Sequence, residues 1–73
     1  MVAKVRIDLD ELQRLRAEHN YSISDLAQIL GYKTPTGYWL IEQGNRKVSV
    51  DTLYRLAEAY SCHMEDLITL TGE

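Results

Sequence analysis

The sequence has few of the residues on which disulfide-bonded and metal-stabilised proteins depend. Its 73 residues include one cysteine, one proline and no phenylalanine. The single cysteine, Cys62, excludes an internal disulfide, and with its neighbour His63 it offers no set of metal ligands. We interpret Cys62 as a small apolar residue of a reducing compartment, and we expect no metal and no cofactor.

Long hydrophobic runs are also missing. No stretch is long enough to span a bilayer, and the first residues lack the apolar centre of a secretion signal. These absences predict a cytoplasmic protein without a membrane partner. The length predicts a single domain, close to the lower size limit for folding without disulfides or metals.

Groups arranged for catalysis are not found in the sequence. His19 and His63 are far apart, and there is no phosphate-binding glycine loop and no cluster of carboxylates. His19 falls near the end of a predicted helix, where it suits the helix dipole better than the role of ligand or catalyst. We therefore expect that the protein is not an enzyme.

An excess of positive charge is missing as well. Lysine and arginine number 8 against 11 acidic residues, so the formal net charge is −3. This argues against a strongly basic nucleic-acid binder. Between residues 33 and 47, however, Lys33, Arg46 and Lys47 stand against Glu42 alone, a balance of +2. Such a basic edge on an acidic body can still meet phosphates locally.

Helical periodicity is present, and it is organised around residues 22–44. Ser22, with Asp25 three residues later, predicts the capped start of a helix. An apolar face follows, and Gly31 suits the left-handed residue that ends such a helix. After a short turn, a second periodic segment is predicted over residues 35–43. Two short helices joined by a tight turn form a helix-turn-helix.

The second helix of this pair has an apolar side and an unusual glycine. Tyr38 and Ile41 are three residues apart and are predicted to face the core, and Gly44 ends the helix. Gly37 costs about 1 kcal/mol relative to alanine inside a helix. Two explanations stay open for Gly37: relief of crowding within the protein, or close approach of the backbone to a partner.

The flanking segments predict three further helices. Asp8, with Glu11 three residues later, predicts a capped helix that ends near residue 20, and Ser49 predicts the cap of a fourth helix. A short last helix is predicted from the apolar residues Met64, Leu67, Ile68 and Leu70. With no convincing sheet, the fold class predicted for residues 8–71 is all-α, a compact domain of five helices.

Residues 1–7 are predicted to form an N-terminal arm. Val5 and Ile7 alternate with Lys4 and Arg6, which is a weak signal for a strand. A lone strand is not stable, so the arm must pair with something or stay loose. Pairing with the same arm of a second chain is one alternative, and a frayed start is the one we favour.

An ordered set of residues resembles a known family. The set consists of Leu15, Arg16, Ser22, Leu26, Ala27, Leu30, Gly31, Ile41, Glu42, Gly44, Arg46, Ser49, Thr52, Leu53, Ala57, Asp66 and Leu67. It resembles the lambda-repressor-like domains, above all the small bacterial and phage regulators of the Cro/C1 or XRE family. The resemblance covers roughly residues 9–70, and it implies a homodimer that binds operator DNA with the helix 35–43 in the major groove.

The resemblance also implies roles for individual positions. Arg16 and Glu42 match an internal ion pair that sets the angle of the helix 35–43. The positions nearest the base edges are matched by Thr34, Thr36, Gly37 and Leu40. The positions that meet DNA phosphates are matched by Lys33, Gln43, Asn45, Arg46 and Lys47.

The sequence departs from the family pattern at several positions. Ile23 stands where the family usually has a glutamine, and Leu40 stands where a polar reader is common. The segment from Gly31 to Gly44 is one residue longer than the usual spacing, and Val48 replaces a frequent proline. Because the reading helix carries few strong hydrogen-bonding side chains, we expect specificity to depend partly on DNA shape.

The leading functional interpretation is a sequence-specific transcriptional regulator, in particular a repressor, that binds a palindromic operator as a homodimer. Its control would come from its own concentration or from a regulatory protein partner. The alternative is a protein–protein interaction module that keeps the fold without specific DNA binding, supported by the acidic charge and by Trp39 beside Leu40. Dimerisation is expected through the last helix (Met64, Leu67, Ile68 and Leu70), with the N-terminal arm as the other candidate.

Overall fold

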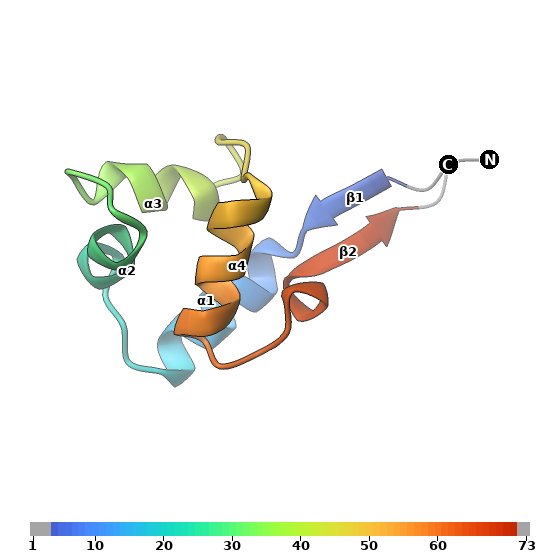
Figure 1. Ribbon diagram of the computed structural model, residues 1–73, viewed down its shortest axis with the longest axis horizontal. Helices are drawn as coiled ribbons and strands as arrows, with labels where there is room; N and C mark the ends of the chain where they lie inside the picture. The colour runs from blue at the N-terminus through green and yellow to red at the C-terminus, as the bar shows by residue number, and fades with distance from the viewer. Residues whose placement is uncertain (1–3, 72–73) are drawn as a thin grey trace.

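The computed structural model describes residues 4–71 and consists of four α-helices between two β-strands (Figure 1). The elements in order are β1 (Lys4–Ile7), α1 (Leu9–Glu18), α2 (Ile23–Leu30), α3 (Thr36–Glu42), α4 (Val50–Ala59), a 3-10 turn η1 (Met64–Leu67) and β2 (Ile68–Thr71). Residues 1–3 of the predicted arm lie outside the described residues.

The predicted helix caps are confirmed. The Asp8 side chain accepts the N–H of Glu11 at 3.1 Å and so starts α1. At α2, Ser22 and Asp25 make both hydrogen bonds of a capping box, at 3.0 and 2.9 Å. Gly31 follows α2 with a φ of +84°, in the left-handed region where glycine is favoured. The helix-turn-helix therefore begins where local hydrogen-bonding chemistry predicts it.

The prediction of an all-α domain with five helices is wrong. The last segment makes a single 3-10 turn over Met64–Leu67, and Ile68–Thr71 then continues as a strand, antiparallel to β1. Ile68 and Leu70 alternate with two threonines, a pattern of period 2 that suits a strand. A strand needs a partner, and here the partner is at the other end of the chain, so local sequence could not reveal it.

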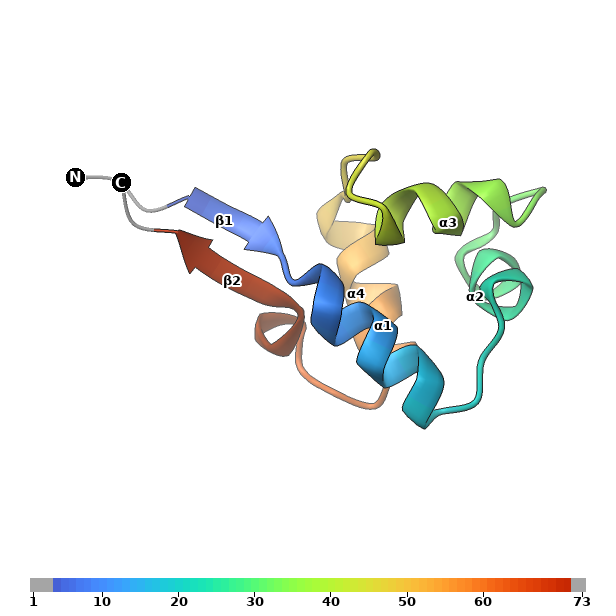
Figure 2. The same ribbon diagram turned by 180° about the vertical axis from the view of Figure 1, so that it is seen from behind.

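Residues 4–7 of the predicted N-terminal arm are not frayed. These residues pair with β2 of the same chain, with Ile7 opposite Ile68 and Lys4 opposite Thr71. The Asp8 N–H donates to the carbonyl of Leu67 at 2.9 Å, which ties the sheet to the start of α1. The two strands extend away from the helices, on the side opposite α2 (Figures 1 and 2).

The sheet has two chemically different faces. Residues directly opposite each other in an antiparallel pair share a face, and alternate residues do too. One face carries the apolar residues Val5, Ile7, Ile68 and Leu70. The other face carries Lys4, Arg6 and Thr69. The sheet is thus amphipathic, with its only charges on the polar face.

The hydrophobic core lies between the helices. Its fully buried residues are Leu12, Leu26, Tyr38, Ile41, Leu56, Tyr60 and Leu67. The prediction that Tyr38 and Ile41 face the core is confirmed, because their exposed fractions are 0% and 1%. Burying apolar side chains of this size contributes about 1.5–3 kcal/mol each, so α3 is held to the body by strong packing at its inner side.

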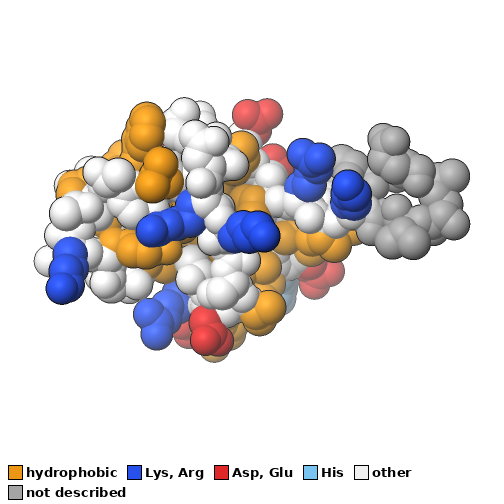
Figure 3. All heavy atoms as spheres, turned by 90° about the horizontal axis from the view of Figure 1, so that it is seen from above, with side chains coloured by type: hydrophobic (Ala, Val, Ile, Leu, Met, Phe, Trp, Pro, Cys, Tyr) orange, Lys and Arg blue, Asp and Glu red, His pale blue; other side chains and the backbone are white. Residues whose placement is uncertain are grey.

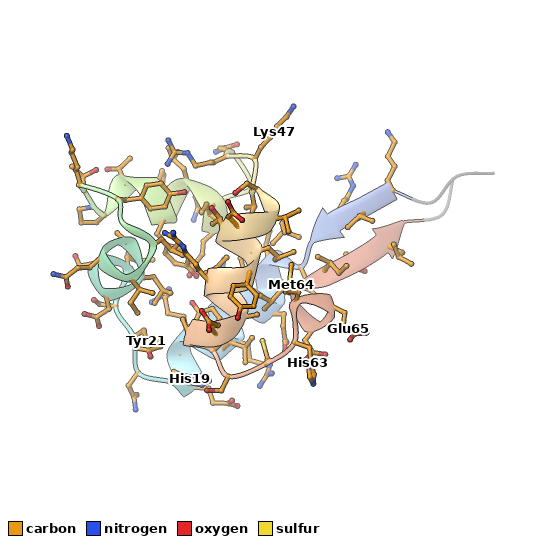
Figure 4. All side chains as sticks on the ribbon, viewed as in Figure 1. His19, Tyr21, Lys47, His63, Met64 and Glu65 are labelled. Carbon is orange, nitrogen blue, oxygen red and sulfur yellow. The ribbon has the colours of Figure 1, made fainter. Side chains whose placement is uncertain are left out.

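Residues 4–71 contain neither a membrane-spanning helix nor a metal-binding group of side chains. No helix in this range combines the length and apolar character needed to cross a membrane. The same residues contain no group of His, Cys, Asp and Glu side chains that could hold a metal ion. His63 lies beside Met64 and Glu65 at η1, whereas His19 lies beside Tyr21 at the end of α1 (Figure 4).

Candidate nucleic-acid interface

Helix α3 divides its residues between the core and the solvent. The buried residues are Gly37, Tyr38, Ile41 and Glu42. On the opposite stripe, Thr36, Trp39 and Gln43 are exposed and Leu40 is half-buried. This division follows the helical period of 3.6 residues. We call these four residues the outer stripe of α3; together with exposed Thr34 they form a surface that faces away from the core.

The turn between α2 and α3 is held by Tyr32. Its N–H donates to the carbonyl of Ala27 at 2.8 Å, and its ring packs against Gly37. A Cβ added at Gly37 would lie 2.5 Å from Cγ of Tyr32, which no real side chain can do without moving the ring. Gly37 was expected near the base edges, but it is buried beneath Tyr32. The explanation by internal crowding therefore holds for Gly37.

Replacing Gly37 with alanine is expected to destabilise the domain by about 1–3 kcal/mol, because the new methyl group displaces the Tyr32 ring. In a Tyr32→Ala background the same substitution should be neutral or stabilising by up to about 1 kcal/mol, since alanine is the better helix former. Urea denaturation of the four proteins measures both effects. Equal destabilisation in the two backgrounds would contradict the role given to Tyr32.

Arg16 joins α1 to the loop before α2 and to the end of α3. Its Nε donates to Oε2 of Glu42 at 2.6 Å, and its second guanidinium nitrogen reaches Oε1 at 3.2 Å. A third bond, at 3.3 Å, goes to the carbonyl of Tyr21 in the loop before α2. The hydrogen bond to Glu42 raises the pKa of Arg16. Glu42 is 3% exposed and the Arg16 side chain is 26% exposed, so the pair predicted from the resemblance is partly buried, and it braces α3.

A second buried polar contact lies beside this brace. The hydroxyl groups of Tyr38 and Tyr60 are 2.7 Å apart and joined by a hydrogen bond. Burial raises the pKa of Tyr60 to about 12, and it raises the pKa of Tyr38 in the same direction. Both hydroxyls therefore hold their protons in the folded protein at a pH where unfolded tyrosine, with a pKa of 10.0, loses them.

This contact predicts a loss of stability in alkaline solution. The two protonated hydroxyls contribute fully to the free energy of unfolding below about pH 10. This contribution falls as the pH rises from the unfolded toward the folded pKa, by about 1.4 kcal/mol per pH unit for each hydroxyl. The Tyr38→Phe/Tyr60→Phe double variant should show a flatter decline between pH 10 and about 11.5. Denaturant titrations at several pH values measure it, with Tyr54→Phe as an exposed control. If the stability of the double variant fell with pH as steeply as that of the unchanged protein, Tyr38 and Tyr60 would not cause the alkaline loss.

The loop after α3 presents two basic side chains. Gly44 has a φ of +77° and lets the chain turn, and the Asn45 N–H closes the turn on the carbonyl of Leu40 at 2.9 Å. The guanidinium carbon of Arg46 lies 4.9 Å from the centre of the Tyr32 ring, a cation–π contact that orients it. Lys47 projects from the top of this loop, away from the body (Figure 4).

Positive charge is concentrated on the face that carries α3. Figure 3 looks onto this face and shows basic side chains over α3, the following loop and β1, with acidic side chains at the margins. Both arginines of α1 form ion pairs: Arg14 pairs with Glu11 and Glu18, and Arg16 pairs with Glu42. Among residues 4–71, Lys33, Arg46 and Lys47 make no ion pair. The face is therefore locally basic despite the acidic net charge.

Ser24 and Gln28 were not identified from the sequence as candidate site residues. Ser24 and Gln28 on α2 line a hollow of about 320 Å³ together with Lys33 and Thr34. Their spacing of four residues places them on one side of α2, which is the signal that could have found them. Ile23, the departure from the usual glutamine, instead packs half-buried against the core. Trp39 is 47% exposed and so belongs to the outer stripe.

The residues expected at a dimer interface have different environments. Leu67 is 0% exposed and belongs to the core, so it cannot contact a second chain, and including it was wrong. Met64 is half-buried against the core, and Ile68 is half-buried in β2. Leu70 is 64% exposed, and Val5 opposite it on β1 is 62% exposed. The strand, not a helix, presents the apolar surface.

This arrangement of helices agrees with comparisons to known proteins. The family model of the Cro/C1-type HTH DNA-binding domain matches residues 11–73. The chain belongs to this family. The Cro/C1-type domain is thus supported by both its sequence and its geometry, in which a braced α3 turns an exposed stripe toward solvent.

Two curated relatives are similar to this Cro/C1-type chain. One, from Pyrococcus horikoshii, is named as an HTH-type transcriptional regulatory protein and is 43% identical over 56 residues, or 77% of this chain and 18% of the relative. The other, from Thermococcus kodakarensis, has the same type of name and is 40% identical over 58 residues, or 77% of this chain and 17% of the relative. The chain spans less than one fifth of the length of either relative.

Proposed function

We propose that this domain is a sequence-specific DNA-binding transcriptional regulator that places α3 in the major groove. The observation that carries the proposal is the outer stripe of α3, which lies on a locally basic face and is held at a defined angle by the buried Arg16–Glu42 pair. The major groove admits a helix, and its base edges carry the sequence information. A rigidly mounted helix with a polar and aromatic outer stripe fits that groove.

Base reading is assigned to the outer stripe and to the turn before it. Thr34 and Thr36 offer hydroxyl groups, and Leu40 and Trp39 offer apolar contact with thymine methyl groups. Gln43 carries an amide that can bind adenine through two hydrogen bonds. Because these contacts are fewer than those of a glutamine- or arginine-rich helix, DNA shape contributes the rest of the specificity.

Phosphate contacts are assigned to the ends of α3. Lys33 lies in the turn before the helix, and Arg46 and Lys47 lie in the loop after it. Asn45 adds an amide group in the same loop. Contacts to phosphates fix the position of a protein on the duplex without reading its sequence. Their arrangement at both ends of α3 would hold the helix along the groove.

A homodimer bound to a palindromic operator completes the proposal. The apolar face of the sheet adjoins the start of α4, and between them lies a hollow of about 370 Å³ lined by Val5, Val50 and Ile68 among others. Val5, Val50 and Leu70 are 62%, 72% and 64% exposed. A second copy would cover this surface in a self-complementary contact.

Sedimentation should show that the unchanged protein is a dimer at tens of micromolar and that the Val5→Lys/Leu70→Lys variant is a monomer.

The regulatory role proposed is repression. A dimer of this size that occupies an operator blocks access to the DNA by its presence alone. No small-molecule site is assigned to it, so release would come from a lower concentration or from a regulatory protein partner.

Selection of bound sequences from a random pool of duplex DNA tests the proposal. The expected result is a palindrome with half-site centres about ten base pairs apart. A Thr36→Ala/Gln43→Ala variant should change the selected bases within each half-site while keeping the spacing. No enrichment over the starting pool with the folded protein would overturn the assignment.

A protein-interaction module is the second candidate, and exposed Trp39 is the observation that favours it. Tryptophan beside half-buried Leu40 is a frequent anchor of protein interfaces. The same selection separates the two candidates, because a module that binds only proteins retains no DNA sequence. In that outcome, Trp39→Ala would abolish binding to the partner.

A further inference from the structure

The polar face of the two-stranded sheet carries only positive charge. Lys4 and Arg6 supply it, and β1 and β2 contain no acidic residue. The cross-strand neighbour of Arg6 on this face is Thr69. In a chain with a net charge of −3, an element with cations on one face and apolar residues on the other is well suited to bind an anionic surface.

This basic strand ends next to the loop that follows α3. A hollow of about 210 Å³ lies between them, and Arg6 and Arg46 line it from opposite elements. Ile7, Leu9 and Ile41 form its apolar floor, and Gly44 completes the wall. Gly44 keeps the loop close to α1, because a Cβ at this position would lie 2.9 Å from Cδ1 of Leu9. Arg6 and Arg46 thus line one hollow although they are 40 positions apart in the sequence.

Neither arginine is committed to an acidic partner among residues 4–71. Arg14 and Arg16 use their guanidinium groups in ion pairs, whereas Arg6 is exposed and forms none. Arg46 is oriented by the Tyr32 ring and also forms none. An exposed pair of like charges is unfavourable alone and becomes favourable when an anion lies between them.

We propose that Arg6 of β1 and Arg46 together bind one phosphate group of the duplex, so that the sheet extends the DNA contact beyond the helix-turn-helix. The inference rests on the proposed DNA binding. The hollow opens beside α3, and basic side chains over β1 and over the loop share one face (Figure 3). A duplex whose major groove holds α3 presents its backbone along that face. Arginine suits the site because its planar fork matches phosphate oxygens.

The test compares Arg6→Gln and Arg6→Lys with the unchanged protein in binding to the selected duplex at 50 to 200 mM salt. Arg6→Gln should weaken binding about tenfold and reduce the slope of log affinity against log salt by less than about 0.9, the value for one phosphate contact, because Arg46 still meets the shared phosphate. Arg6→Lys should restore the slope and part of the affinity. Arg14→Gln, which removes an arginine from α1, is the control and should change neither. Thermal melting verifies that each variant is folded.

Phosphate ethylation interference locates the contact. Ethylation of one phosphate per half-site should inhibit binding of the unchanged protein, and it should inhibit binding of Arg6→Gln less strongly. An unchanged salt slope and an unchanged interference pattern in Arg6→Gln would overturn the inference while leaving the proposed function intact. Failure of the unchanged protein to bind any duplex would overturn both.

Discussion

Arg16→Met is expected to lower the free energy of unfolding by about 3 kcal/mol. The substitution keeps the length and apolar stem of the side chain, but it leaves the carboxylate of Glu42 without its ion-pair partner. Glu42 is 3% exposed, and breaking a buried pair by removing one partner costs about 3–5 kcal/mol. In a domain of this size the melting temperature should fall by about 12–24 °C, which thermal unfolding followed by circular dichroism measures.

Two further variants make this result specific. Arg14→Met removes an exposed arginine of the same helix, whose pairs with Glu11 and Glu18 are at the surface, and it should cost less than about 1 kcal/mol. The Arg16→Met/Glu42→Leu variant removes both charges and should recover most of the lost stability. If Arg16→Met were no more harmful than Arg14→Met, the pair would not brace α3.

Arg46→Ala/Lys47→Ala is expected to weaken binding to all DNA sequences by about 100-fold or more at low salt, the loss of two charge-assisted contacts of about 1.5 kcal/mol each. The slope of log affinity against log salt should decrease by about 1.8, because each phosphate contact contributes about 0.9. Sequence preference should not change, since phosphate contacts carry no base information. Fluorescence anisotropy with a selected and a scrambled duplex at several salt concentrations measures all three quantities.

The controls for this prediction come from the other side of the molecule and from the reading helix. Arg14→Ala removes one positive charge from α1 and should leave the slope unchanged. Gln43→Ala should weaken binding to the selected duplex more than to the scrambled one. An Arg46→Ala/Lys47→Ala protein with the salt slope of the unchanged protein would show that the loop does not meet phosphates.

Local sequence was sufficient to predict the helix-turn-helix. Ser22, Asp25 and Gly31 each act within a few residues of their own position, by a capping box and by a left-handed turn. The inner side of α3 followed from the spacing of Tyr38 and Ile41. Such signals depend on hydrogen bonds and periodicity inside one element, so they can be read without knowing what packs against it.

The candidate site was predicted less completely. Positions in loops, such as Arg46 and Lys47, are exposed as the resemblance implied. Gly37 was predicted near the base edges, but it packs against the ring of Tyr32. This contact forms only when the turn folds back on α3, so the sequence did not reveal it. Arg6 was missed because β1 lies far from α3 in the sequence, and the hollow between Arg6 and Arg46 exists only in the folded chain.

The sequence by itself determined the helices α1 to α4, the caps of α1, α2 and α4, and the side of α3 that is buried, since these depend on contacts within about four residues. Only the tertiary structure decided that Ile68–Thr71 is a strand, that Leu67 belongs to the core, and that β1 joins the basic face. The physical reason is that a strand is stabilised by hydrogen bonds to a partner, which here lies about sixty residues away. Pairing of the chain ends thus turned a predicted arm and a predicted helix into one amphipathic sheet.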